Sequence, residues 1–102
     1  MKEPSALASM TELRAEIDRI DRALVELLVH RAACIDRAVV LKRQSGLPAR
    51  IEPRVAEVLA NVRRIAEAAA LDPALAEDLW RQIVEWSIRR EERELAGSEG
   101  QG

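Results

Sequence analysis

The 102-residue sequence has no tyrosine or phenylalanine, one cysteine, and few glycines and prolines. Its only aromatic residues are two tryptophans, so it lacks the stacking platforms on which single-stranded nucleic acids bind. A net charge of −2 also argues against binding nucleic acid by phosphate neutralisation. The single cysteine, Cys34, excludes an internal disulfide and a cysteine-based metal cluster, and it suits a reducing compartment.

Several other signals are missing from the sequence. No apolar run is long enough to span a bilayer, and residues 1–9 contain no hydrophobic segment of signal-peptide length, so we expect a cytoplasmic protein. There is no zinc-ligand spacing, glycine-rich phosphate loop or serine elbow, so we expect no metal and no cofactor. No alternating pattern indicates a strand.

The sequence does contain one long helical stretch, from Thr11 to Arg43, with no proline or glycine. We predict Thr11 as its N-cap. A helix of that length is about 50 Å long, which exceeds the width of a compact domain of this size. A second copy of the chain is the economical partner, so we predict a homodimer. The helix carries one apolar stripe: Leu13, Ile17, Ile20, Leu24, Leu27, Leu28, Ile35, Ala38 and Val39.

Two shorter helices are predicted after it. The segment 44–52 contains Ser-Gly and a proline, which end the first helix. A second helix is predicted over 52–70, and a third begins at Pro73, with Asp72 as its cap, and ends near Ala96. The predicted fold is all-α, with one long and two shorter helices. The expected parts are a flexible tail at 1–9, a helical domain at 10–96 and a flexible tail at 97–102.

Two cations, Arg31 and Lys42, interrupt the apolar stripe. They are eleven residues apart and so point the same way, with Cα atoms roughly 16 Å apart, which leaves room for a small dianion between their side chains. Arg14 is too far along the helix to join them, except from an antiparallel partner chain. Arg54 adds a cation beside a helix N-terminus, which itself favours anions. We expect a polyanion site shared across the dimer; the alternative is that these charges are solvated or paired.

The predicted third helix offers Ser87 and Glu91 on an otherwise apolar line. Both side chains could face a polar pocket. The alternative for Glu91 is that it begins the charged, solvated end of the helix. His30 and Cys34 are one turn apart, but no third member completes a nucleophilic site, so we expect a half-buried cysteine. The chain therefore offers positioned positive charge rather than acid–base machinery, which suits electrostatic stabilisation of a polarised transition state.

These residues, in this order, resemble the all-helical (class II) chorismate mutase family over about 10–95. The resemblance implies an intertwined homodimer that converts chorismate, a small dicarboxylate, to prephenate without a cofactor or covalent intermediate. It also implies that Arg14 of the partner chain and Arg31 bind carboxylates, that Lys42 bonds the ether oxygen, and that Arg54 binds substrate. The matching residues are Leu13-Arg14, Ile17-Asp18, Ile20-Asp21, Leu24, Leu27-Leu28, Arg31, Lys42, Pro48 and Arg54.

Three positions depart from the pattern of these mutases. Val55 stands where they have a glutamate that bonds the ring hydroxyl, Ile51 replaces an aspartate, and Glu91 replaces a glutamine that shares the ether oxygen. Glu91 must be protonated to donate there, so we expect the highest activity in mild acid.

Val55 and the segment 83–86 resemble the isochorismate pyruvate lyase branch, which forms salicylate and pyruvate. A 4-amino-4-deoxychorismate mutase is a further alternative. A non-catalytic dimerisation or regulatory module is the alternative from another class.

Overall fold

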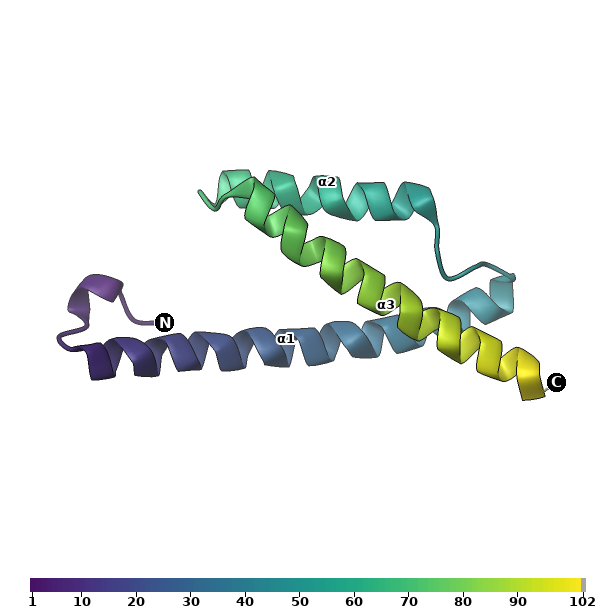
Figure 1. The fold of residues 1–102 in the computed structure, drawn as a ribbon, viewed down its shortest axis with the longest axis horizontal. Helices are drawn as coiled ribbons and strands as arrows, with labels where there is room; N and C mark the ends of the chain where they lie inside the picture. Colours follow the sequence, from purple (N-terminus) through teal and green to yellow (C-terminus); the bar gives the residue numbers. More distant parts are fainter. Residues whose placement is uncertain (102) are drawn as a thin grey trace. The chain divides into compact units, whose positions relative to one another are not determined.

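The structure, a computed structural model, describes the backbone of residues 1–101 and the side chains of residues 1–97. No strand occurs within the described backbone. The all-α architecture of one long and two shorter helices is confirmed. The elements are a 3-10 turn (Pro4–Ala6) and helices α1 (Met10–Ser45), α2 (Glu52–Ala68) and α3 (Pro73–Gln101) (Figure 1).

The chain divides into two compact units, and the division falls inside α1. The first unit is Met1–Cys34; the second begins at Ile35 and holds the end of α1, the connection after it, α2 and α3. The predicted site residues are therefore split. Arg14 and Arg31 belong to the first unit, and the others belong to the second.

Ser9, rather than Thr11, caps the start of α1. The Ser9 hydroxyl accepts a hydrogen bond from the Glu12 N–H at 3.1 Å, and the Glu12 carboxylate accepts one from the Ala8 N–H at 2.7 Å. The predicted cap at Thr11 is wrong because Ser9 lies three residues before a glutamate. That spacing lets each side chain satisfy a free N–H at the helix start.

Glu16 is a buried charge of the first unit, with 5% of its side chain exposed. Burial raises the pKa of Glu16, but hydrogen bonds from the Arg19 guanidinium and the Lys2 backbone outweigh burial and bring this pKa below its ordinary value. The Arg19 contact is 3.1 Å long. The Arg19 guanidinium thus compensates the buried charge of Glu16.

The apolar stripe predicted along α1 is largely exposed in the first unit of the single chain. Leu27 is 67% exposed, and Ile17, Leu24 and Leu28 are also exposed. Leaving several large apolar side chains in water is unfavourable by about 1.5–3 kcal/mol each relative to burial. Such a face is suited to burial against a partner, and the homodimer stays a prediction.

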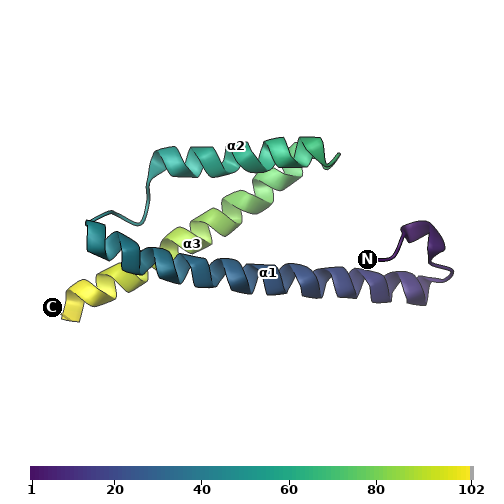
Figure 2. The ribbon, with the colours of Figure 1, turned by 180° about the vertical axis from the view of Figure 1, so that it is seen from behind.

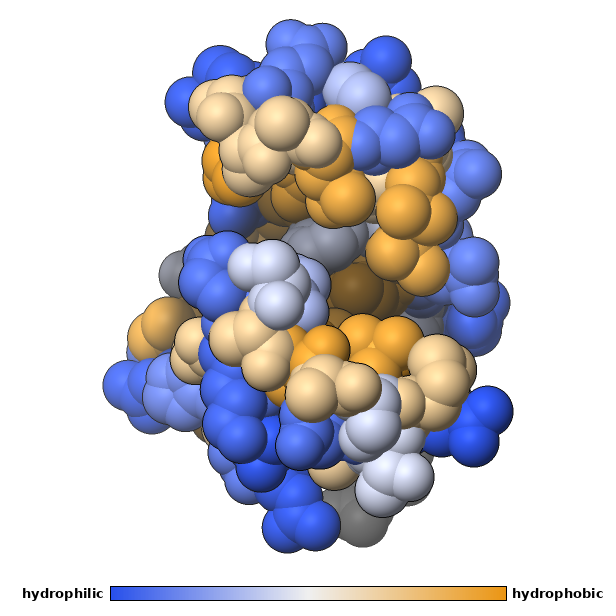
Figure 3. Space-filling view, turned by 90° about the vertical axis from the view of Figure 1, so that its left-hand side faces the viewer, coloured by the Kyte–Doolittle hydropathy of each residue, from blue (hydrophilic) through white to orange (hydrophobic). Residues whose placement is uncertain are grey.

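In the second unit, α2 and α3 are successive helices that pack against each other across a short turn (Figures 1 and 2). As predicted, Asp72 caps α3, because its carboxylate accepts the Ala74 N–H at 2.9 Å. Figure 3 looks onto the end where this turn lies and shows apolar side chains at the surface. The core of the unit is Ala49, Val84 and Ile88, with Val55, Val58 and Leu95 packed against it.

Helices α1 and α2 end with the same backbone geometry. In α1, Gly46 has a φ of 67°, and the N–H of Leu47 bonds to the carbonyl of Lys42 at 2.9 Å. In α2, Ala70 holds the corresponding position with a φ of 60°, and the next N–H bonds to the carbonyl five residues earlier at 2.8 Å. Both are Schellman ends, which require a left-handed residue that is usually glycine.

Two predicted helix ends differ from the structure. α2 ends at Ala68, because the left-handed Ala70 cannot continue it. α3 ends at Gln101 rather than near Ala96. Gly97 lowers helix propensity by about 1 kcal/mol but, unlike proline, removes no hydrogen bond, so the helix passes through it. The expected tail at 97–102 is therefore helical up to Gln101, and Gly102 lies outside the described residues.

Candidate active site

A partly buried ion pair joins α1 to α3 at Lys42, the predicted catalytic cation. Lys42 Nζ lies 2.9 Å from Glu91 Oε1, with 18% and 5% of the two side chains exposed. The same ammonium donates a hydrogen bond to the Ala49 carbonyl at 2.7 Å. Among the described residues, Glu91 Oε1 has no partner in hydrogen-bond geometry, so charge alone holds this contact. An ammonium has three N–H groups, so a further donor is available to a ligand.

The sequence places both charges next to apolar neighbours. Val39, one turn before Lys42, is 4% exposed, and Ile88, one turn before Glu91, is also 4% exposed. Burying a charge is costly unless an opposite charge meets it, and here each residue supplies that charge for the other. The alternative that Glu91 begins a solvated helix end is wrong, because its side chain is buried.

The remaining predicted residues of the second unit lie on α3 and at the start of α2. Ser87 is buried one turn before Glu91, and its hydroxyl donates to the Ile83 carbonyl at 2.8 Å. The Ile51 carbonyl accepts the first N–H groups of α2. Arg54 is exposed and pairs with Glu57 on its own helix.

Val55 is half-buried against the apolar core of the second unit. A carboxylate at this position would meet that core. The apolar residue is thus consistent with its packing.

The two arginines predicted to bind carboxylates both lie on the first-unit part of α1. Arg14 is exposed and Arg31 is half-buried. Cys34 is exposed, so the expectation of a half-buried cysteine is wrong for the single chain. His30 is exposed as well.

The sequence did not predict two charged links in the second unit. The Arg50 guanidinium bonds both oxygens of Glu85, at 3.0 and 2.6 Å. The Arg90 guanidinium bonds both oxygens of Asp36, at 2.7 and 3.0 Å, and lies 5.4 Å from the ring centroid of Trp86. The four-residue spacing of Trp86 and Arg90 signals their contact. The ion pairs join residues 35 and 54 positions apart, for which no local signal exists.

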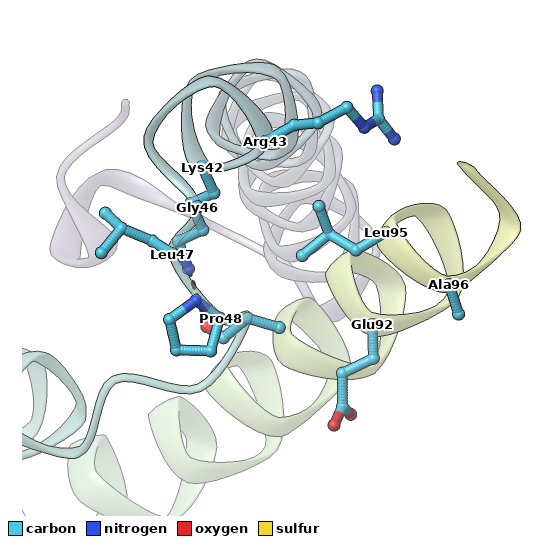
Figure 4. A pocket seen from close by; sticks show the side chains of 9 residues that line it. Lys42, Arg43, Gly46, Leu47, Pro48, Glu92, Leu95 and Ala96 are labelled. Carbon is cyan, nitrogen blue, oxygen red and sulfur yellow. Dashed lines mark hydrogen bonds between the residues drawn. The ribbon is translucent and has the colours of Figure 1, made fainter. Parts of the chain in front are cut away.

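A cavity of about 650 Å³ opens beside Lys42 in the second unit (Figure 4). The end of α1 and the connection after it form one wall, and the last described turns of α3 form the other. Lys42 is the predicted site residue that lines this cavity. Its lining is Lys42, Arg43, Gly46, Leu47, Pro48, Ala49, Glu92, Leu95 and Ala96.

Comparison with known proteins shows the family of the chain. Residues 13–92 match the family model of chorismate mutase type II. The chain belongs to this family. The match contains all the predicted site residues, from Arg14 to Glu91.

Three relatives illustrate the range of the family. The chain is 36% identical to a T-protein of Enterobacter agglomerans over 85 residues and 32% identical to a T-protein of Haemophilus influenzae over 87 residues. These matches cover 83% and 85% of the chain but 23% of each T-protein, so the chain spans about a quarter of their length. It is 35% identical to an isochorismate pyruvate lyase of Pseudomonas aeruginosa over 89 residues, which is 86% of each protein.

Within the described part of the chain, no helix is both long and apolar enough to cross a membrane.

Proposed function

We propose that the protein is a chorismate mutase that converts chorismate to prephenate by positioning and electrostatic stabilisation. The observation that carries this proposal is the Lys42 ammonium, held by the Ala49 carbonyl and the Glu91 carboxylate with a donor to spare. In this rearrangement an ether C–O bond breaks while a C–C bond forms, and negative charge develops on the ether oxygen. A fixed ammonium beside that oxygen stabilises the transition state more than the ground state.

The other cations bind the substrate's two carboxylates. Arg31 and Arg54 serve from the same chain as Lys42, and Arg14 serves from the partner of a homodimer. Arginine suits this role because its planar fork matches a carboxylate. The exposed apolar stripe of α1 supports the dimer, since a second copy would cover it. In this proposal the Ser87 hydroxyl is a further substrate contact.

Isochorismate is the second candidate substrate. Breaking its ether bond with transfer of a ring hydrogen to the enolpyruvyl carbon gives salicylate and pyruvate, and the same cations would stabilise that step. Val55 and Ile51 favour isochorismate as the substrate, because neither side chain can form a hydrogen bond with the ring hydroxyl of chorismate. The end-to-end match with an isochorismate pyruvate lyase favours it too. For 4-amino-4-deoxychorismate, the apolar Val55 would adjoin an amino group instead.

Product analysis tests the proposal. The purified protein is incubated separately with chorismate, isochorismate and 4-amino-4-deoxychorismate, and the products are identified by mass spectrometry. We expect prephenate from chorismate, and loss of activity in Lys42→Gln but not in Lys2→Gln, the matched control on the chain's only other lysine. Salicylate with pyruvate would establish the lyase instead. Turnover of none of the three would overturn an enzymatic function and favour a dimerisation or regulatory module.

A further inference from the structure

The connection between α1 and α2 is held at two successive residues. Ala49 is 8% exposed, packs in the core of the second unit, and accepts the Lys42 hydrogen bond on its carbonyl. The next residue, Arg50, forms the two-point ion pair with Glu85 of α3. The carbonyl that holds Lys42 therefore lies between a core contact and a charged link.

The geometry of the Arg50–Glu85 pair makes it more than an ordinary surface contact. The side chains are 38% and 42% exposed, and most ion pairs that exposed contribute little. This pair is bidentate, so it fixes orientation as well as distance. Its hydrogen bonds hold the pKa of Glu85 below its ordinary value and raise the pKa of Arg50. Both groups therefore stay charged throughout the neutral range.

The link to Lys42 follows from the planarity of the peptide bond. The carbonyl of Ala49 and the Cα of Arg50 belong to one rigid peptide plane. Anchoring the Arg50 side chain restricts the rotation of that plane, and the buried Ala49 methyl restricts it from the other side. The direction of the Ala49 carbonyl, and with it the place of the Lys42 ammonium, depends on both anchors.

We propose that Arg50 and Glu85 are positioning residues whose ion pair orients the Ala49 carbonyl and, through it, the Lys42 ammonium. The catalytic consequence rests on the proposed function, but the orientation of Lys42 does not. Arg50 acts through a backbone carbonyl and does not touch substrate. The competing idea is that Arg50 is a further substrate-binding cation held by Glu85, and the two ideas predict different kinetics.

Kinetics of single and exchanged variants separate the two ideas. If the pair positions Lys42, Arg50→Gln and Glu85→Gln each lower kcat about tenfold with KM changed less than about twofold, because misplacing a catalytic group reduces transition-state stabilisation. The exchange Arg50→Glu with Glu85→Arg regains most of the loss. A raised KM in Arg50→Gln, without loss in Glu85→Gln, would overturn the proposal in favour of substrate binding.

Glu77→Gln is the matched control. It weakens the part-buried contact of 3.4 Å between Arg63 of α2 and Glu77 of α3, which also links two elements of the second unit, together with the contact of Glu77 with Arg81 on its own helix. We expect its kcat to equal that of the wild type. An equal loss in Glu77→Gln would show that any weakened helix contact lowers activity, and it would overturn a specific role for Arg50 and Glu85.

A spectroscopic readout tests the orientation without activity. The chain has two lysines, so protein labelled with 13C at lysine Cε gives two side-chain signals, and the Lys42 signal is assigned by its loss in Lys42→Gln. We expect Glu85→Gln to move the Lys42 signal toward that of Lys2, and Glu77→Gln to leave it in place. An unmoved signal in Glu85→Gln would overturn the proposal. Failure of wild-type turnover would instead overturn the proposed function and leave this test intact.

Discussion

Lys42 Nζ and Glu91 Oε1 lie 2.9 Å apart, so the two residues expected to act on one ether oxygen neutralise each other. A carboxylate beside that oxygen would repel its developing negative charge. A carboxylic acid would donate a hydrogen bond to the ether oxygen. It would also leave the full charge of the Lys42 ammonium to stabilise that oxygen. The reaction as proposed therefore favours an uncharged hydrogen-bond donor at position 91.

Replacing the Glu91 carboxylate by an amide should therefore raise activity. We expect a higher kcat/KM in Glu91→Gln, because the amide donates a hydrogen bond to the ether oxygen and does not repel its developing charge. Steady-state rates with chorismate measure this. Glu94→Gln, on an exposed glutamate of the same helix, serves as the control and should keep the wild-type rate. A lower kcat/KM in Glu91→Gln would contradict the role given to Glu91.

Stability should depend on pH through two other carboxylates. Hydrogen bonds from Arg90 lower the pKa of Asp36 from 3.8, and those from Arg50 lower the pKa of Glu85 from 4.5. Because the folded pKa values are the lower ones, this stabilisation is present above the ordinary values and is lost as pH falls through the folded ones. The free energy of unfolding should therefore fall below about pH 4.5.

Urea denaturation across this acid range measures the effect. The double variant Asp36→Asn with Glu85→Gln should show a shallower decline than the wild type, because it has lost two of the titrating groups. Glu57→Gln, which alters an exposed pair within α2, is the control and should follow the wild type. An unchanged slope in the double variant would show that neither ion pair contributes.

Substitutions at the two Schellman ends should change the stability of the protein in opposite directions. Ala70→Gly should stabilise the protein by about 0.5–1 kcal/mol, because glycine adopts a positive φ without strain. Gly46→Ala should destabilise the protein by a similar amount. An added Cβ at Gly46 meets no atom within 4 Å, so the change in stability comes from the strained backbone conformation alone. Thermal or urea unfolding measures both. Opposite signs support the assignment, and destabilisation by Ala70→Gly would refute it.

Much of the fold was predictable from local chemistry. The apolar period of α1, the proline at the start of α2 and the Asp72 cap of α3 all act within a few residues, and the structure contains each feature. The sequence also indicates the cap at Ser9, since Ser9 lies three residues before Glu12. Ala70 had none, because alanine carries no marker for a left-handed helix end.

The site was predictable only in part. Lys42 stood out because it interrupts an apolar stripe, and its buried contact with Glu91 agrees with that reading. The Ala49 carbonyl could not be foreseen, since every residue has a carbonyl and only the folded connection selects this one. The Arg50–Glu85 pair was equally hidden, because its members are 35 residues apart on separate elements.

The central claim is that Lys42 catalyses in a site completed by Arg14 of a partner chain, and mixed dimers test it most directly. Arg14→Ala and Lys42→Gln, each inactive alone, are co-expressed with different tags and assayed for chorismate turnover. Lys42→Gln co-expressed with Arg31→Ala is the control and should stay inactive, because both positions belong to the same site of one chain. The account predicts about one quarter of wild-type activity for the first mixture, since half the dimers are mixed and each restores one of two sites. A mixture as inactive as its separate parts would contradict it.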